Sequence, residues 1–221
     1  MGYTQRMPYT TLFIDLDDTV YPTSSGLWDA IRERIDLYMI ERVHIAPDRV
    51  TLLRKNLFST YGTTMRGLVA EYQIDEQDYL DFVHNVPLAD YISPNPLVRQ
   101  ALGLYPQRKV IFTNADTNHA NRVLSILQLA DCFDQIIDIR AIAPFCKPQP
   151  DAFRKALDHS GEKNPAKCVL VDDALFNVTA ARELGFYTVQ VGPKTSVTNS
   201  HASIESLSEL PLVLDPNDSD K

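Results

Sequence analysis

A short apolar run that stops at a cluster of acids constrains this chain more than any other feature. Residues 12–14 read Leu-Phe-Ile, and Asp15, Asp17 and Asp18 come directly after them. A buried parallel strand tolerates almost no charge, so the acids must begin where a predicted strand, residues 10–16, ends. Ligands of open α/β sheets bind at this end of the strands, and a hard cation such as Mg²⁺ would neutralise the crowded acids. The alternative is an acidic turn that caps a helix.

Composition is that of an ordinary globular protein and narrows the choice of partners. The 221 residues are 44% hydrophobic and 23% charged, which suits one elaborated domain or two small ones. The net charge of −8 argues against a surface for polymeric nucleic acid but allows a small phosphorylated substrate. No apolar run approaches the roughly 20 residues that span a bilayer, and the N-terminus lacks an apolar signal core, so we expect no membrane partner. Three scattered cysteines then predict reduced thiols in a cytoplasmic protein.

The segment after the first strand has the periodicity of helices and contains no convincing strand. Helical patterns cover residues 26–43, 47–61, 64–72 and 76–83. We predict that residues 20–91 form an all-helical cap domain, inserted after the first strand. The alternative is that these helices pack on one face of the sheet.

Strands and helices alternate again beyond residue 92. We expect strands at residues 109–112, 135–138, 167–171 and 186–191, and helices at 96–104, 118–129, 151–160 and 176–184. A final helix and short strand are expected within residues 204–214. The predicted fold class is α/β, with a Rossmann-like parallel sheet core in three α/β/α layers. Residues 1–19 and 92–215 form this core domain, and residues 216–221 a flexible tail.

Polar residues follow the other predicted strands as well. Thr113 and Asn114 come after the strand at 109–112, Asp172 and Asp173 after the strand at 167–171, and Lys147 lies in a loop before a helix. Right-handed crossovers bring the ends of parallel strands to one edge of the sheet, so these side chains are expected to converge. Taken singly, the acids and Thr113 read as helix caps and Lys147 as a solvated lysine. Their joint occurrence favours a site.

The predicted set suits phosphoryl transfer. A carboxylate at Asp15 can attack phosphorus, and a second carboxylate at Asp17 can protonate the leaving oxygen and later deprotonate water. Mg²⁺ would offset the charge of the approaching phosphate. Thr113 and backbone N–H groups can hold the other phosphate oxygens, and Lys147 can act as a positive point charge. Asp18 is expected to accept a hydrogen bond in the turn and to take no part in catalysis.

Four stretches in chain order carry a family resemblance. They read Phe13-Ile14-Asp15-Leu16-Asp17-Asp18-Thr19, Ile111-Phe112-Thr113-Asn114, Cys146-Lys147-Pro148 and Val169-Leu170-Val171-Asp172-Asp173. The chain resembles the haloacid dehalogenase-like (HAD) hydrolase superfamily of the helical-cap type. The resemblance implies Asp15 as nucleophile, Asp17 as general acid and base, Thr113 as phosphate binder and Lys147 as charge stabiliser. Dehalogenases of this family lack the second aspartate of the first motif, so Asp17 indicates phosphate chemistry.

The resemblance also implies a magnesium site. Its ligands would be the Asp15 side chain, the Asp17 backbone carbonyl and one acid of the last motif. Alignment of Asp173-Ala174 with the usual Asp-Ser of the family makes Asp173 the direct ligand, with Asp172 acting through water; the reverse order is the alternative.

A narrower resemblance links the chain to the pyrimidine 5′-nucleotidase branch. It is carried by residues 17–22, by Phe112-Thr113-Asn114-Ala115, and above all by the cap stretch Tyr61-Gly62-Thr63-Thr64-Met65-Arg66-Gly67-Leu68. The resemblance implies that Arg66 faces the site and binds substrate, alongside Thr113, Asn114 and Lys147. The alternative is that Arg66 braces the cap. Trp28, Tyr61 and Tyr91 are further cap candidates for substrate contact.

The expected function is that of a Mg²⁺-dependent phosphomonoesterase that works through an aspartyl-phosphate. Its substrate would be a small phosphorylated metabolite, with a pyrimidine nucleoside 5′-monophosphate as first candidate. A phosphoglucomutase-like phosphotransferase, a sugar phosphatase and a regulatory protein on a HAD-like fold are the alternatives. The sequence leaves open whether the protein is a monomer or a homodimer.

Overall fold

A parallel sheet of six strands forms the centre of the protein. The computed structural model describes residues 9–193 and 199–216. The strands are β1 (Thr11–Ile14), β2 (Arg108–Phe112), β3 (Gln135–Ile137), β4 (Cys168–Asp172), β5 (Tyr187–Val191) and β6 (Ala202–Ile204). Their order across the sheet is β3-β2-β1-β4-β5-β6, and every neighbouring pair is parallel. The acidic stretch therefore leaves the sheet at its middle, from β1, between the ends of β2 and β4.

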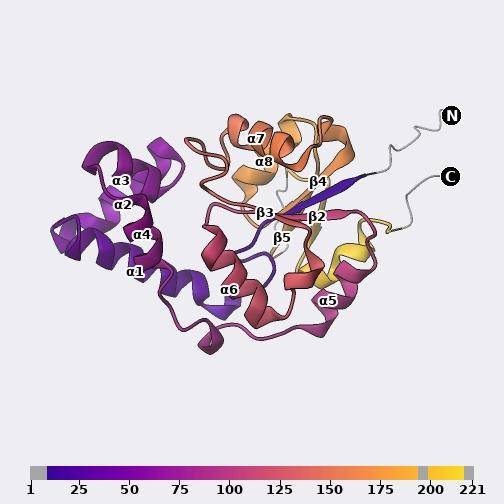
Figure 1. Cartoon of the computed structure of the whole chain (residues 1–221), viewed down its shortest axis with the longest axis horizontal. Helices are drawn as coiled ribbons and strands as arrows, with labels where there is room; N and C mark the ends of the chain where they lie inside the picture. The colour runs from indigo at the N-terminus through magenta and orange to yellow at the C-terminus, as the bar shows by residue number, and fades with distance from the viewer. Residues whose placement is uncertain (1–8, 194–198, 217–221) are drawn as a thin grey trace.

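Helices cover both faces of this sheet, as the predicted three-layer fold class requires. Helices α5 (Pro96–Gly103) and α6 (Thr117–Leu127) lie on one side, and α7 (Pro150–Ser160) and α8 (Leu175–Glu183) on the other (Figure 1). Side chains alternate between the two faces of a strand. Accordingly Leu12 and Ile14 of β1 pack with α5 and α6, whereas Phe13 packs in a second cluster with Phe153 of α7. The two apolar cores hold the middle strand rigidly between them.

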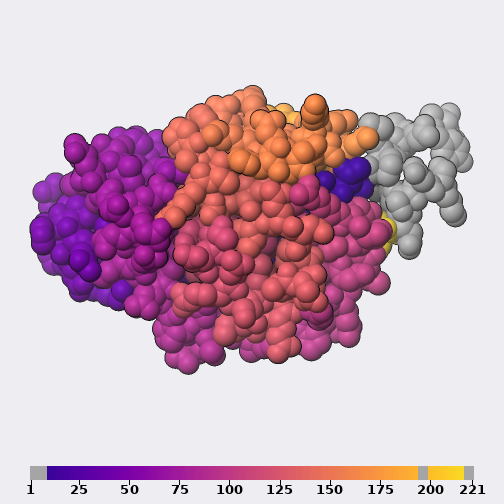
Figure 2. Space-filling model, in the orientation of Figure 1, coloured from indigo at the N-terminus to yellow at the C-terminus, as the bar shows by residue number. Residues whose placement is uncertain are grey.

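The four helices after β1 form a separate lobe beside the carboxyl edge of the sheet (Figure 1). They are α1 (Leu27–Glu41), α2 (Pro47–Tyr61), α3 (Thr64–Tyr72) and α4 (Glu76–Val83). This arrangement agrees with the predicted helical insertion and differs from the alternative, in which the helices cover a sheet face. Figure 2 shows the lobe in continuous contact with the core on this side of the molecule. We call this lobe the cap; its limits at residues 20 and 91 stay a prediction.

Two glycines allow close approaches of the cap. A Cβ at Gly67 of α3 would lie 2.7 Å from the Cβ of Leu57 on α2, so only glycine lets these helices cross so closely. Gly62 ends α2 with φ +85°, a conformation that side chains rarely adopt. A Cβ there would lie 2.6 Å from Sγ of Cys146 in the core. The cap therefore touches the core at the residue that precedes Lys147.

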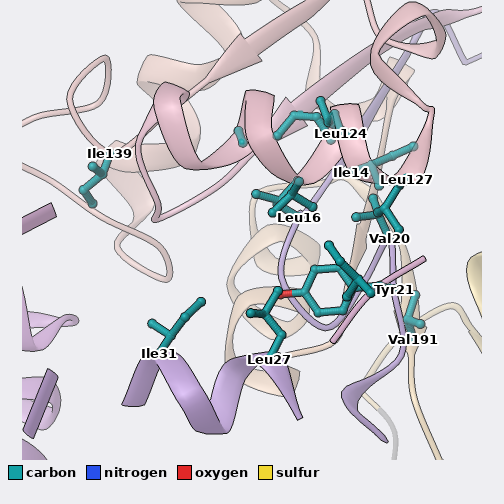
Figure 3. Close-up of a cluster of buried hydrophobic side chains, with 14 of the residues drawn as sticks. Ile14, Leu16, Val20, Tyr21, Leu27, Ile31, Leu124, Leu127, Ile139 and Val191 are labelled. Carbon is teal, nitrogen blue, oxygen red and sulfur yellow. The ribbon is translucent and has the colours of Figure 1, made fainter. Parts of the chain in front are cut away.

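Buried residues beside the acids anchor the loop that follows β1. Leu16, Val20 and Tyr21 are buried, and they pack with the α6 residues Leu124 and Leu127 (Figure 3). Full burial of such a side chain contributes about 1.5–3 kcal/mol. This packing fixes the backbone of the loop and thereby holds the neighbouring carboxylates at the end of β1.

The largest difference from the predicted elements is at the end of the chain. A helix followed by a strand was expected within residues 204–214, but the strand β6 comes first and a 3₁₀ helix, η5 (Leu207–Leu212), follows it. Pro211 lies inside that helix, where its missing N–H disfavours a regular α-helix. The other predicted elements agree with the structure to within two residues. The tail beyond residue 216 lies outside the described residues.

None of the helices in the described part of the chain combines the length and the apolar character that crossing a membrane requires.

Candidate active site

The predicted core residues converge on one cavity between the strand ends and the cap. Its volume is about 550 Å³, within the range of small-molecule sites. The predicted residues that line it are Asp15, Asp17, Thr113, Asn114, Lys147 and Asp173. They come from the ends of β1, β2 and β4 and from the loop before α7, as the parallel topology implies.

Lys147 is the buried positive charge of the site. Its Nζ lies 2.7 Å from Oδ1 of Asp15 and 2.7 Å from Oδ2 of Asp172, and the side chain is almost fully buried. Burial acts to lower the pKa of the ammonium group, but the two carboxylates raise this pKa above its ordinary value. Lys147 therefore stays charged, and the solvated-lysine alternative does not describe it.

Asn114 holds the loop that carries Lys147. Its Oδ1 accepts from the Lys147 N–H at 2.9 Å, and its Nδ2 donates to the Lys147 carbonyl at 3.0 Å. This reciprocal pair joins the end of β2 to the loop before α7. Asn114 was predicted to bind substrate, and it does line the cavity. Its amide group is already used to position the lysine, whereas substrate contact by Asn114 stays a prediction.

Three carboxylates are crowded beside this lysine. Oxygen atoms of Asp15, Asp172 and Asp173 all lie within 4.8 Å of one another. Burial raises the pKa of Asp15 well above its ordinary range; Lys147 opposes this effect, and the neighbouring acids add to it. Burial and the Asp172 carboxylate likewise raise the pKa of Asp173 to about 7. One ammonium group is too little positive charge for three acids, and oxygen ligands of this kind fit a hard divalent cation.

Asp172 and Asp173 have different surroundings. Asp172 has no exposed surface, and both of its oxygens are engaged: Oδ1 accepts from the N–H of Ala174 and from Asn177, and Oδ2 accepts from Lys147. Asp173 lines the cavity, and its N–H donates to Thr19 Oγ1 at 3.1 Å. Asp173 is therefore the acid of this pair with access to a bound group.

Thr113 brings a hydroxyl group to the wall of the cavity. It lies at the end of β2, is almost fully buried and lines the cavity. Its Oγ1 accepts from the N–H of Ala115 at 2.9 Å, which fixes the oxygen and leaves the hydroxyl hydrogen available to donate.

Asp17 is held by two residues that the motif analysis missed. Its Oδ1 lies 2.6 Å from the hydroxyl of Tyr21 and 2.9 Å from Nε2 of His119. Burial acts to raise the pKa of Asp17, yet the contacts with His119 and Tyr21 bring this pKa below its ordinary value. The one signal in the sequence was a histidine on the apolar face of the predicted helix at 118–129, next to Ala120.

Asp18 differs from its predicted role as a hydrogen-bond acceptor. Its Oδ1 is buried and has no hydrogen-bond partner among the described residues. The residue adopts a left-handed conformation with φ 58°, which aspartate tolerates better than most side chains. Burial and the neighbouring Asp17 raise the pKa of Asp18 to about 6. The backbone of Asp18 thus allows the tight turn, while its Oδ1 has no hydrogen-bond donor among the described residues.

Arg66 lies outside the residues that line the cavity. Its guanidinium donates to Glu76 at 2.9 Å and to the carbonyl of Ile139 at 2.7 Å, so it links α3 to α4 and to the core loop after β3. This is the bracing role that the sequence left open. Of the other cap candidates, Trp28 lines the cavity, whereas Tyr61 and Tyr91 are not among its lining residues.

Comparison with known proteins shows the family to which the chain belongs. The haloacid dehalogenase-like hydrolase family matches residues 9–185, so the chain belongs to this family of hydrolases. Phosphate metabolism protein 8 of Saccharomyces cerevisiae is 28% identical, over 92% of this chain and 72% of the yeast protein. The Escherichia coli fructose-1-phosphate phosphatase YqaB is 30% identical, over 83% of this chain and 96% of that enzyme.

Solved structures share the fold. CbbY from Rhodobacter sphaeroides in complex with phosphate superposes with a TM-score of 0.65 at 15% identity, over 91% of this chain and 96% of that one. The L-2-haloacid dehalogenase from Xanthobacter autotrophicus gives a TM-score of 0.62 at 16% identity, over 92% and 97%. At such identities the likeness concerns the fold alone.

Proposed function

We propose that this hydrolase is a Mg²⁺-dependent phosphomonoesterase that forms an aspartyl-phosphate on Asp15. The observation that carries the proposal is the convergence of Asp15, Asp17, Thr113 and Lys147 on one cavity. A carboxylate nucleophile, a second carboxylate two residues later, a hydroxyl donor and a buried ammonium group are the parts that attack on a phosphate ester requires.

In the first step, an oxygen of Asp15 attacks phosphorus and the bond to the leaving oxygen breaks. Asp17 gives its proton to that oxygen, so an alcohol departs and Asp15 carries the phosphoryl group. In the second step, Asp17 takes a proton from water while the water oxygen attacks phosphorus. Inorganic phosphate leaves, Asp15 is restored and Asp17 is again protonated.

The remaining site residues neutralise and orient charge. Lys147 stabilises the Asp15 carboxylate before attack and an oxygen of the phosphoryl group after it, and the Thr113 hydroxyl donates to another phosphoryl oxygen. Asp15 and Asp173 would hold Mg²⁺ together with the Asp17 carbonyl, with Asp172 behind them. When bound, Mg²⁺ supplies positive charge between the nucleophile and the phosphate.

Aromatic side chains at the wall of the cavity support a substrate whose leaving group carries an aromatic ring. Trp28 of α1, Phe58 of α2 and Phe176 of α8 line the cavity and are 41%, 44% and 48% exposed. The rings of Phe58 and Phe176 are 5.9 Å apart and meet edge to face, so they join cap and core above the site. A nucleobase stacked on such a ring gains about 1–3 kcal/mol. We therefore propose a nucleoside 5′-monophosphate, with the pyrimidine branch as first candidate.

A sugar phosphate is the second candidate, because a relative of this chain is a fructose-1-phosphate phosphatase. Measurement of kcat/KM for pyrimidine and purine nucleoside monophosphates and for fructose 1-phosphate separates the two. We expect the pyrimidine nucleotide to be preferred. Preference for fructose 1-phosphate would reject the nucleotide assignment but keep the phosphatase, whereas turnover that requires a sugar bisphosphate would indicate a mutase.

The chemistry is tested by phosphate release from p-nitrophenyl phosphate with Mg²⁺ and with excess EDTA. We expect release to require Mg²⁺ and the variant Asp15→Asn to lose at least about 10⁴-fold in kcat. Asp48→Asn, on the exposed surface of α2, is the matched control and should keep full activity. Release without Mg²⁺, or by Asp15→Asn, would contradict the mechanism. Cytoplasmic placement is part of the proposal, in keeping with three free cysteines in the described chain.

A further inference from the structure

His119 is a buried histidine of α6 that contacts Asp17, the proposed acid and base. It lies in the first turn of α6, and its side chain has no exposed surface. Its Nε2 is 2.9 Å from Oδ1 of Asp17. Whether Asp17 is ionised or carries its proton on Oδ2, Oδ1 only accepts hydrogen bonds, so Nε2 carries the hydrogen in this contact.

Tyr21 donates to the same oxygen of Asp17. The distance from its hydroxyl to Oδ1 is 2.6 Å, and its ring is packed in the apolar core beside Val20 and Leu27 (Figure 3). Two donors from different elements therefore hold Oδ1. The described residues provide no hydrogen bond to Oδ2 of Asp17, and the residue lines the cavity. One carboxylate oxygen is fixed by the protein, and the other is left for the substrate.

The imidazole of His119 packs against a second histidine. The ring of His84 stacks on it with the centroids 4.1 Å apart and the planes inclined by 17°. Nδ1 of His84 lies 3.1 Å from Oδ1 of Asp116, which also accepts from the backbone N–H of His119. Arg122 of α6 donates to the His84 carbonyl at 2.8 Å. Because His84 follows α4, the end of the cap helices is connected to Asp17 through His119.

We propose that His119, together with Tyr21, is a positioning residue that presents Oδ2 of Asp17 to the leaving oxygen of the substrate. The inference rests on the proposed function. In the first step the bond between phosphorus and the leaving oxygen breaks, and the proton on Oδ2 of Asp17 moves to that oxygen. His119 gains or loses no proton in this step; it keeps the carboxyl group in the orientation that proton transfer needs.

The dependence of the rate on the leaving group tests this role. An alkyl phosphate needs protonation of its leaving oxygen, whereas p-nitrophenolate departs with little help. The value of kcat/KM covers the reaction up to departure of the leaving group, so it isolates the step in question. For His119→Leu we expect kcat/KM to fall about 100-fold for an alkyl phosphate and by less than about threefold for p-nitrophenyl phosphate.

Two further variants keep the test decisive if His119→Leu folds poorly. His119→Gln carries an amide N–H that can reach Asp17, so it should restore most of the alkyl phosphate activity. Tyr21→Phe keeps the packed ring and removes the second donor, so it should show the same selective loss to a smaller extent. His44→Gln, at an exposed position in the loop before α2, is the control and should behave like the wild-type protein.

An equal loss for both esters, or no loss for either, would overturn the proposal, because a structural role of His119 does not distinguish leaving groups. Failure of His119→Gln to recover activity towards the alkyl phosphate would overturn it as well. The proposed function fails by a different result, namely full activity of Asp15→Asn.

Discussion

The core side and the cap side of the cavity are built in opposite ways. On the core side, Asp172 accepts hydrogen bonds at both oxygens, and Lys147 bridges two carboxylates. On the cap side, Trp28 and Phe58 present exposed rings to the same space. Buried charges require defined partners, whereas an apolar wall requires only shape. From this difference we expect the proposed reaction to be sensitive to each member of the core network, and substrate choice to depend on a surface that tolerates change.

Removal of the buried ammonium group should break the core side most severely. In Lys147→Met, the carboxylates of Asp15 and Asp172 stay buried without their shared cation. We expect the free energy of unfolding in metal-free buffer to fall by about 3–5 kcal/mol, measured by urea denaturation. Lys163→Met, on an exposed loop, should change it by less than about 0.5 kcal/mol. Equal stability of the two variants would show that the core network is not coupled through Lys147.

Magnesium should stabilise the folded protein through the same acids. At 100 times its dissociation constant, a ligand that binds only the folded state adds about 2.7 kcal/mol, which thermal unfolding with and without Mg²⁺ can detect. The variant Asp173→Asn should lose most of this gain. Asp151→Asn, a half-exposed position in the first turn of α7, should keep it. A full Mg²⁺ effect in Asp173→Asn would instead point to Asp172 as the direct ligand.

The cap should be sensitive to packing between its own helices. In Gly67→Ala the new methyl group meets Leu57, with the Cβ atoms 2.7 Å apart, and such overpacking costs about 1–3 kcal/mol. A Cβ at Gly103, at the end of α5, meets nothing within 4 Å, so Gly103→Ala should be neutral or slightly stabilising. The measurement is chemical denaturation. If Gly67→Ala were as stable as Gly103→Ala, the helix crossing would have to be looser than described.

The smallest effect is expected where the cap wall meets the substrate. Trp28→Ala should lower kcat/KM for a nucleoside monophosphate about tenfold, in line with the loss of one stacking contact, and leave a small alkyl phosphate unaffected. Leu52→Ala, an exposed residue of α2, is the control. An equal loss for both substrates would mean that Trp28 supports the cap fold and does not select the leaving group.

The convergence of the residues at the strand ends was predictable from the sequence because one rule of topology governs it. In a parallel sheet with right-handed crossovers, residues that directly follow each strand meet at one edge. Asp15, Thr113 and Asp173 obey that rule, so their convergence followed from the order of the motifs. Lys147 does not follow a strand directly; its position before the helix at 151–160 placed it with the set, and the family resemblance gave its role. The structure adds the Asn114 pair that holds it there.

The remaining site residues depend on packing that a linear pattern does not contain. His119 belongs to none of the four family motifs, and neither it nor Tyr21 was among the predicted site residues. Their contact with Asp17 exists only because the loop after β1 folds back onto α6. Arg66 shows the same limit: its motif agreed equally with substrate contact and with bracing, and the carbonyl of Ile139, 73 residues away, decides its bonding in the structure.

The close contact of Gly62 with Cys146 has a consequence for protein engineering. Exchange of caps between related hydrolases is an obvious way to change their substrates, and the connections beside the first strand look like the natural places to cut. Yet Gly62, near the middle of the cap, packs against the thiol of Cys146, the residue that precedes Lys147. A grafted cap with a bulkier residue there would press on the lysine loop and disturb the reaction together with the specificity. Modular exchange in this protein therefore requires that the glycine and the small cysteine travel as a pair.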